Sequence, residues 1–120
     1  MGGTAAVRRS RRERSAREQL LAEVLESELQ TSILDAARKL GWKHYHTHNS
    51  RRSPSGFPDL VLVKPPRVIF AELKREREDP DDEQLVWYGL LIQCPGVESY
   101  VWRPRDIDDV LQVLQGGGGR

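Results

Sequence analysis

Apolar residues recur at helical spacing along residues 17–40 and stop before Gly41. The apolar stripe consists of Leu20, Leu21, Val24, Leu25, Leu29, Ile33, Ala36 and Leu40. Intervals of three and four residues place such positions on one side of an α-helix, and a glycine commonly follows the last helical turn. The pattern therefore predicts an amphipathic helix over residues 17–40.

Two short apolar segments follow, at residues 60–63 and 68–71, and both are apolar at successive rather than alternating positions. Such runs are typical of strands that are covered on both faces. Residues 64–67 lie between them and contain two prolines, which favour a tight turn. The three segments together predict a β-hairpin inside a covered sheet.

The rest of the pattern adds strands and helices around this hairpin. Residues 42–48 predict a strand before it, and residues 97–102 predict a fourth strand after it. A helix is expected over residues 83–93, and a last helix over 106–114 with an aspartate as its cap. The order αβββαβ(α) predicts an α/β fold with a mixed four-stranded sheet flanked by helices.

Composition limits the class of protein. The chain has 120 residues, 38% of them hydrophobic and 31% charged, which fits one globular domain. No apolar run approaches the length of about 20 residues that a membrane span needs. The single cysteine, Cys94, cannot form an internal disulfide and is expected to be a small buried residue. These features are compatible with a reducing cytoplasm.

Positive charge is concentrated at the N-terminus. Residues 1–19 carry six arginines and two glutamates, whereas residues 20–120 carry 13 basic and 16 acidic side chains. We expect a flexible basic arm over residues 1–17, a folded domain over 18–115 and a flexible glycine-rich tail over 116–120. A basic arm favours contact with a polyanion, although a solvated tail without a ligand has the same composition. The candidate DNA contacts in the arm are Arg8, Arg9, Arg11 and Arg12.

The hairpin places ionisable groups together. If its turn is centred between Pro65 and Pro66, then Asp59 lies opposite Glu72, and Lys74 shares a face with Glu72. Two carboxylates about 4 Å apart repel each other by about 4 kcal/mol at an effective dielectric constant near 20. A fold tolerates such a pair when a divalent cation bridges it or when one carboxyl group stays protonated. Carboxylate oxygens favour Mg²⁺ or Mn²⁺ over zinc.

Two further polar residues are candidates for the same site. Glu28 falls between Val24 and Leu25 on the inward stripe of the first predicted helix, where an unpaired carboxylate would be costly. It is therefore a candidate third acidic ligand, and the alternative is a glutamate at the edge of the stripe that reaches solvent. Gln84 shares a helical face with Trp87 and is expected to point inward as well.

The motifs, taken together, resemble the VRR-NUC family of restriction-endonuclease-like nucleases, whose shared signature is PD…(D/E)xK. An ExK triplet alone is a weak signal, but its place after a GxPD motif and between two characteristic helices makes the match specific. The resemblance extends from Glu28 to Asp106. It rests on Glu28 and Gln30, on Gly56-Phe57-Pro58-Asp59-Leu60, on Glu72-Leu73-Lys74, and on Gln84 with Trp87.

The resemblance implies a metal-dependent DNA phosphodiesterase that leaves a 5′-phosphate and a 3′-hydroxyl. Lys74 would orient or activate the attacking water, and Gln84 would support the site. The cofactor would be Mg²⁺ or Mn²⁺, present as one or two ions. The implied ligands are Asp59, Glu72, Leu73 through its backbone carbonyl, and Glu28 either directly or through water.

Other polar residues favour contact with phosphates. The loop before Gly56 contains Arg51, Arg52 and Ser53, for which a solvated loop is the alternative. Three histidines alternate along the predicted first strand, and the outer two would lie about 13 Å apart, too far to share one metal ion. Contact with DNA is the other role open to them. These histidines are His44, His46 and His48.

Size narrows the class of nuclease. Almost the whole chain is nuclease core, which leaves no separate domain to read a DNA sequence. We therefore expect a stand-alone enzyme that acts on branched DNA in replication, recombination or repair. Stand-alone phage and bacterial members of the resembled family are similar to Holliday junction resolvases, whose paired incisions need a homodimer. The expected location is the cytoplasm of a bacterium or of a phage-infected host.

Two rival interpretations remain. A nicking or restriction-like endonuclease on duplex or single-stranded DNA would have the same catalytic residues. A non-catalytic DNA-binding protein could keep the fold without turnover. The acidic pair Asp59 and Glu72 together with Lys74 argues against the second rival, because binding alone does not need two carboxylates that repel each other.

Overall fold

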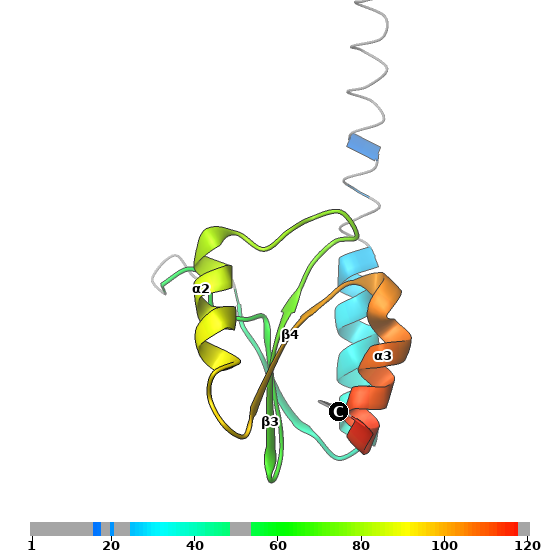
Figure 1. Ribbon diagram of the computed structural model, residues 1–120. Coiled ribbons are helices and arrows are strands. Elements are labelled where there is room, and N and C mark those ends of the chain that lie inside the picture. Colours follow the sequence, from blue (N-terminus) through cyan, green and yellow to red (C-terminus); the bar gives the residue numbers. More distant parts are fainter. Residues whose placement is uncertain (1–15, 18–19, 21–24, 49–53, 118–120) are drawn as a thin grey trace, which may run out of the picture.

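The structure is a computed structural model that describes residues 16–17, 20, 25–48 and 54–117. It contains one four-stranded sheet with helices on both of its faces (Figure 1). None of the helices in these described ranges is long and apolar enough to cross a membrane. The fold class predicted from the sequence is confirmed.

The sheet is mixed, as predicted. Its strands follow one another in chain order, and only the last pair is parallel. Antiparallel neighbours can be joined by short turns, whereas a parallel pair needs a crossover, which is made here by the helix α2 (Asp82–Leu91). The strands are β1 (Lys43–His46), β2 (Leu60–Lys64), β3 (Arg67–Leu73) and β4 (Val97–Trp102).

The β2–β3 hairpin has the predicted register. Leu60 pairs with Ala71, and Lys64 pairs with Arg67 across the two-proline turn. Because successive side chains of a strand point to opposite faces, this register sends Leu60 and Leu62 to one face and Val61 to the other. Leu60 and Leu62 are fully buried, whereas Val61 is only half-buried.

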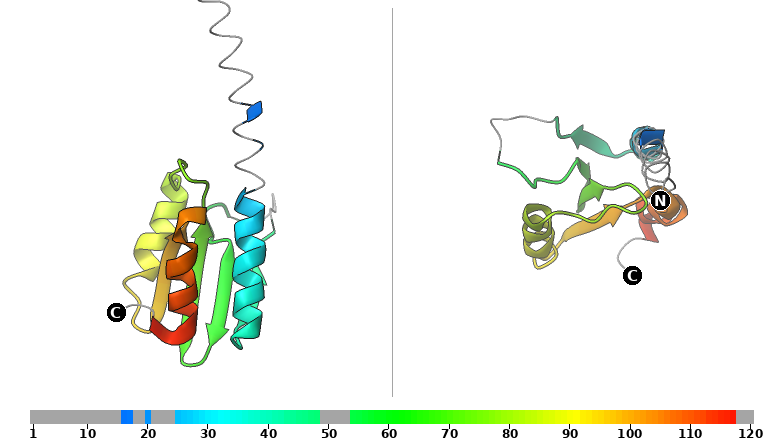
Figure 2. Two further views of the ribbon diagram at one scale, coloured as in Figure 1. Left: turned by 90° about the vertical axis from the view of Figure 1, so that its right-hand side faces the viewer. Right: turned by 90° about the horizontal axis from the view of Figure 1, so that it is seen from above.

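The two faces of the sheet are covered unequally. The N-terminal helix, described over residues 25–39, and α3 (Ile107–Gln112) lie side by side on one face, and α2 lies on the other (Figures 1 and 2). The main core fills the space between the sheet and the N-terminal helix with α3, and no residue of α2 is fully buried. The core residues are Leu29, Ile33, Ala37, Trp42, Leu60, Leu62, Ile69, Ala71, Leu73, Trp102, Val110 and Leu114.

Several predictions about burial differ from the structure. Complete burial of β2 and β3 on both faces is wrong, because α2 leaves part of its face open. Cys94, expected to be buried, is exposed just beyond α2. In the N-terminal helix Ala37 is fully buried and Ala36 only partly, while Leu20 is 64% exposed. Of the other predicted stripe residues, Leu21 and Val24 lie outside the described part of the chain.

The last helical segment starts with a tight turn, η1 (Pro104–Asp106), and ends in a wider turn, η2 (Val113–Gly117). Asp106 occupies the predicted cap position of α3, but its carboxylate makes no capping bond to that helix. It accepts a hydrogen bond of 2.9 Å from the backbone N–H of Arg103 instead. Asp106 therefore closes the turn that enters the helix.

A half-buried arginine joins the hairpin to the end of the chain. The Arg67 guanidinium donates two hydrogen bonds of 2.7 Å to the carboxylate of Glu98 and one of 2.8 Å to the carbonyl of Val113. It also lies over the ring of Trp42, 4.9 Å from the ring centroid. Trp42 in turn donates to the Leu114 carbonyl at 3.0 Å. This cluster fastens the end of the sheet that lies away from Glu72.

Removing this arginine should destabilise the fold. Arg67→Ala leaves the Glu98 carboxylate without its main partner in a half-buried place, which is expected to cost about 2–4 kcal/mol in the free energy of unfolding. Urea denaturation followed by circular dichroism measures it. The control is Arg38→Ala, which removes an exposed pair with Asp35 worth less than about 1 kcal/mol. Equal losses in the two variants would contradict this assignment.

Candidate active site

Three ionisable side chains meet at one end of the β2–β3 hairpin. The hairpin register, extended by one residue on each strand, sets Asp59 opposite Glu72. The Oδ2 atom of Asp59 accepts a hydrogen bond of 2.8 Å from the backbone N–H of Leu73. The Nζ atom of Lys74 lies 3.8 Å from Oε2 of Glu72. The structure thus brings together the three residues that the sequence predicted to converge.

The loop before β2 is fixed against α2. Gly56 has a φ of +93°, and a Cβ added there would lie 2.7 Å from the backbone carbonyl of Glu83, so only glycine fits. Phe57 packs edge-to-face against Trp87 and Phe70, with ring centroids 5.0 and 6.0 Å apart. Packing of this kind gives the loop one position relative to the helix.

The same loop is held by the residue after β1. The Thr47 hydroxyl donates to the Pro58 carbonyl at 2.8 Å, and the Thr47 N–H donates to the Asp59 carbonyl at 2.7 Å. Asp59 is therefore fixed through its backbone by Thr47 and through its side chain by Leu73. Its carboxylate is placed before any ligand binds.

Gln84 connects the N-terminus of α2 to Glu72. Its Oε1 atom accepts from the backbone N–H of Asp81 at 2.9 Å, and the Asp81 carboxylate accepts from the Gln84 N–H at 2.9 Å. This reciprocal capping pair uses the amide oxygen of Gln84 as an acceptor and leaves its amide nitrogen available as a donor. Nε2 donates to Oε2 of Glu72. The helix cap thereby orients the carboxylate.

Burial makes the acidic pair costly to charge. Burial, together with the repulsion from Asp59, raises the pKa of Glu72 to about 8. Burial also raises the pKa of Asp59, an effect that the hydrogen bond from Leu73 partly offsets. Among the residues described, Oε1 of Glu72 is buried without a hydrogen-bond partner. The buried Oε1 atom of Glu72 therefore lacks a partner that a cation could provide.

These donors fit a divalent cation. Asp59 and Glu72 present carboxylate oxygens side by side, and hard oxygen donors suit Mg²⁺ or Mn²⁺. A bound cation would satisfy the buried oxygen of Glu72 and relieve the repulsion within the pair. Within the described ranges, no group of three or more His, Cys, Asp and Glu side chains is arranged to hold a metal ion. The protein ligands that the described part offers are therefore the pair itself, with the carbonyl of Leu73 beside it in sequence.

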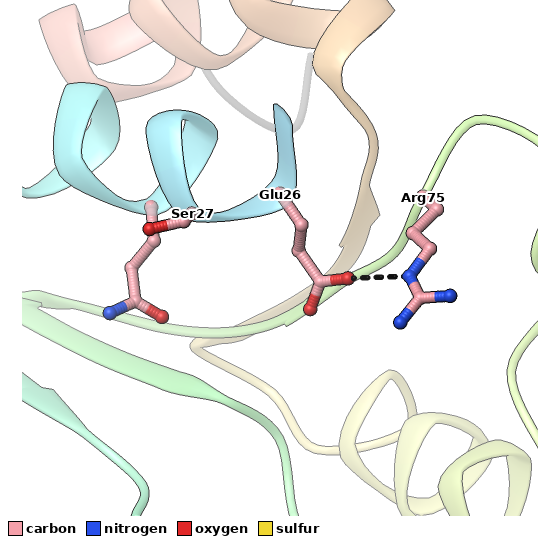
Figure 3. A pocket seen from close by; sticks show the side chains of 4 residues that line it. Glu26, Ser27 and Arg75 are labelled. Atoms are coloured by element: carbon pink, nitrogen blue, oxygen red, sulfur yellow. Dashed lines mark ion pairs between the residues drawn. The ribbon is translucent and has the colours of Figure 1, made fainter. Parts of the chain in front are cut away.

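The predicted inward position of Glu28 is wrong. Its side chain is exposed on the N-terminal helix. Glu26 of the same helix is half-buried instead and forms an ion pair with Arg75, with Oε2 and Nε 3.5 Å apart (Figure 3). Burial raises the pKa of Glu26, and the charges of Glu78 and Asp59 raise it further. Glu26 is thus the helix carboxylate within electrostatic reach of the pair.

Helical phase explains this correction. A residue turns about 100° along an α-helix, so Glu26, seven positions before Ile33, points within about 20° of it. Glu28 is five positions before Ile33 and points about 140° away. The prediction for Glu28 inferred the inward face of the helix from Val24 and Leu25, which lie near the beginning of the apolar stripe. The fully buried residues further along the helix would have selected Glu26.

Glu26 lies at a small polar hollow. The hollow has a volume of about 270 Å³ and is lined by Glu26, Ser27, Gln30 and Arg75 (Figure 3). Gln30 and Arg75 approach it from the helix and from the segment after β3, respectively. The Gln30 of the resembled motif therefore lies beside Glu26 at this hollow.

The segment after β3 is held by Arg103, whose role the sequence pattern did not reveal. The Arg103 guanidinium donates to the Glu78 carbonyl at 2.9 Å and to the Asp79 carboxylate at 3.3 Å. Glu78 also places Oε1 3.9 Å from Nζ of Lys74. Because the contacts of Arg103 join residues more than 20 positions apart, no local sequence pattern predicts them.

The predicted contacts with DNA phosphates stay predictions. The seven predicted DNA-contact residues lie outside the described part of the chain. They are Arg8, Arg9, Arg11, Arg12, Arg51, Arg52 and Ser53. Among the histidines, His46 and His48 have ring centroids 4.4 Å apart.

Comparison with known proteins supports the fold. No family model matches the sequence, and no curated protein matches it. Among solved structures, the chain is similar to one described as a VRR_NUC domain, with a TM-score of 0.60 and 23% sequence identity. The match covers 73% of this chain and 95% of that domain. The chain therefore has the fold of a VRR-NUC domain, as the motifs predicted.

The raised pKa of Glu72 predicts a stability that falls with pH. Because the folded protein binds this proton more tightly than the unfolded chain, the stabilisation is complete below pH 4.5 and is lost as pH rises through about 8. In EDTA, the Tm should fall by about 5 °C between pH 5.5 and 8.5. Added Mg²⁺ should restore most of the loss at pH 8.5, because it binds the charged pair of the folded state.

Differential scanning fluorimetry of variants checks the cause. Glu72→Gln removes the titrating group and should flatten the dependence of Tm on pH, as well as the response to Mg²⁺. Glu83→Gln changes an exposed carboxyl group near the same helix terminus and should behave like the unchanged protein. A fall in Tm that persists in Glu72→Gln would assign the effect to other groups.

Proposed function

We propose that this protein is a metal-dependent DNA endonuclease that hydrolyses phosphodiester bonds. The observation that carries the proposal is the fixed cluster of Asp59, Glu72 and Lys74 at the end of the hairpin. A buried and a half-buried carboxylate beside one lysine are a poor solution for stability alone. They suit a reaction that needs a cation and a positive charge next to a phosphate. The similarity in fold to a VRR_NUC domain supports this class of activity.

The acidic pair would hold the cofactor. Asp59 and Glu72 bind Mg²⁺ or Mn²⁺, with the Leu73 carbonyl as a further oxygen donor. Such an ion lowers the pKa of the attacking water and stabilises the charge on the leaving oxygen. Gln84 keeps the Glu72 carboxylate turned toward Asp59 through the hydrogen bond from its Nε2 atom. The products carry a 5′-phosphate and a 3′-hydroxyl.

Lys74 would act on the phosphate and on the water. Its ammonium group is nearly buried and lies between Glu72 and Glu78, at 3.8 and 3.9 Å. The two carboxylates hold the ammonium group in place by charge attraction, so that it lies across the site. From there it orients the attacking water and stabilises the negative charge that develops on the phosphate. Glu26 completes the acidic surroundings from the N-terminal helix.

Substitution distinguishes these roles. Lys74→Met should lower kcat/KM for DNA cleavage by about 10³-fold, because the charge on the transition state loses its partner. Lys39→Met, which removes an exposed lysine, should leave the rate unchanged. Gel assays with end-labelled DNA in 5′- and 3′-label formats measure the rate and identify the end groups.

The two helix glutamates give a second, independent comparison. Glu26→Gln should lower kcat/KM by about tenfold, because its carboxylate lies within electrostatic reach of Asp59. Glu28→Gln should stay within about twofold of the unchanged enzyme, because its side chain is exposed. The reverse order, with Glu28 as the sensitive residue, would refute the placement of Glu26 in the site.

The preferred substrate is proposed to be branched DNA. The described ranges form the nuclease fold, and we propose that this fold recognises DNA by its shape. Paired incisions across a junction need two sites, which a two-fold homodimer supplies. The basic arm would add contacts to phosphates through Arg8, Arg9, Arg11 and Arg12.

A comparison of substrates tests this preference. The protein is incubated with a labelled four-way junction and with a linear duplex of matched sequence, in Mg²⁺, Mn²⁺ or EDTA. We expect metal-dependent paired cuts in the junction and at least about tenfold slower cutting of the duplex. Light scattering at the assay concentration should give the mass of a dimer. Equal cutting of both DNAs would indicate a general endonuclease, and binding without cutting would indicate a non-catalytic DNA-binding protein.

A further inference from the structure

A second hollow opens beside Asp59, on the α2 side of the sheet. Its volume is about 660 Å³, and it lies between the N-terminal half of α2, the loop before β2, and the end of β1. Both Asp59 and Gln84 belong to its wall, so it is continuous with the candidate active site. The lining residues are Tyr45, Thr47, His48, Pro54, Ser55, Gly56, Phe57, Asp59, Asp81, Gln84 and Trp87.

The described part of the wall of this hollow offers no positively charged partner to a phosphate. It contains the carboxylates of Asp59 and Asp81, and no lysine or arginine is among its described lining residues. A phosphate that entered the hollow beyond the cation proposed at Asp59 would be repelled by the carboxylate of Asp81. The hollow at Glu26 differs in this respect, because Arg75 lines it. Among its described residues, the larger hollow therefore favours an uncharged group over a phosphate.

Aromatic rings make up much of the wall. Phe57 and Trp87 pack edge-to-face and form a rigid back wall. Tyr45 pairs with Val61 across β1 and β2, so its ring stands on the same sheet face as α2. The ring is 61% exposed, because α2 does not extend over β1. Tyr45 thus offers a flat surface on a strand, close to the catalytic carboxylate.

We propose that this hollow binds an unpaired nucleobase of the DNA strand next to the cleaved phosphate, with Tyr45 as its stacking partner. A volume of about 660 Å³ falls in the range of roughly 300–1,000 Å³ found for sites that enclose small organic ligands. A base inside a duplex cannot enter such a site, because it is stacked and paired. The inference rests on the proposed nuclease function and names the feature of its substrate, an unpaired nucleotide at the cut.

A cycle of two changes tests the contact. In a forked DNA, the unpaired nucleotides within three positions of the cut are replaced by abasic residues, and Tyr45→Ala removes the ring. Each change alone should lower kcat/KM by about tenfold, in line with stacking of one base on an aromatic side chain. The two together should cost no more than either one, because both remove the same contact. Tyr45→Phe keeps the ring and should keep the activity.

The matched control is Leu90→Ala. Leu90 is 59% exposed and lies on α2 outside the hollow, so its loss should leave both DNAs cut at the unchanged rate. Multiplying effects of Tyr45→Ala and base removal would overturn the proposal, and so would an unchanged rate in Tyr45→Ala. A shift from dimer to monomer in Tyr45→Ala without any dependence on the base would assign the surface to a protein contact and overturn it as well.

A binding measurement separates this inference from the proposed function. The fluorescent base 2-aminopurine is placed at the unpaired position, and the protein is added in EDTA, where no cleavage is expected. Quenching that is lost in Tyr45→Ala supports the base site, even if no metal ion then yields cleavage and the nuclease proposal fails. Cleavage without quenching would leave the nuclease proposal standing and overturn the base site. Absence of both would overturn the two together.

Discussion

The pairing register of one hairpin determines the whole site. A two-residue turn between Lys64 and Arg67 sets Asp59 opposite Glu72 on the face that α2 covers. A shift by one residue would turn Asp59 to the opposite face, under the N-terminal helix, and would destroy the cluster. The register is secured by Leu60 and Leu62, which are fully buried on that other face. Burial of the core on one side of the sheet thus fixes the chemistry on the other.

The site costs stability, and the parts of the fold that offset this cost lie elsewhere. Charging both Asp59 and Glu72 is unfavourable in a place where neither is fully hydrated, as the raised pKa of each shows. The hydrogen bonds from Leu73 and Gln84 orient the carboxylates without neutralising them. Compensation comes from the main core on the opposite face of the sheet and from the Arg67 cluster at the other end of the hairpin. Because of this separation, the two carboxylates can keep an unfavourable arrangement that a cation would relieve, while the sheet remains stable.

The features of this structure that local sequence patterns determine were predicted better than the features that depend on long-range contacts. The turn between two prolines was enough to derive the register, and the register was enough to bring Asp59, Glu72 and Lys74 together. The Glu28 prediction failed because the beginning of an apolar stripe gives a poor estimate of the inward direction, whereas the fully buried residues point to Glu26. The contacts of Arg67 and Arg103 span 24 to 46 residues and leave no periodic signal. The hollow at Tyr45 depends on the lateral placement of α2, which no sequence pattern encodes.

The same contacts that serve the acidic pair also leave the hollow open. The N-terminus of α2 is fixed by the hydrogen bond from Gln84 to Glu72 and by the close approach of Gly56 to Glu83. A helix fixed there cannot also move sideways over β1, so the ring of Tyr45 stays uncovered next to Asp59. An open aromatic surface would be a liability in a protein that only had to be stable. Here it follows directly from the positioning of Glu72, and it places a surface for a base beside the groups that act on the neighbouring phosphate.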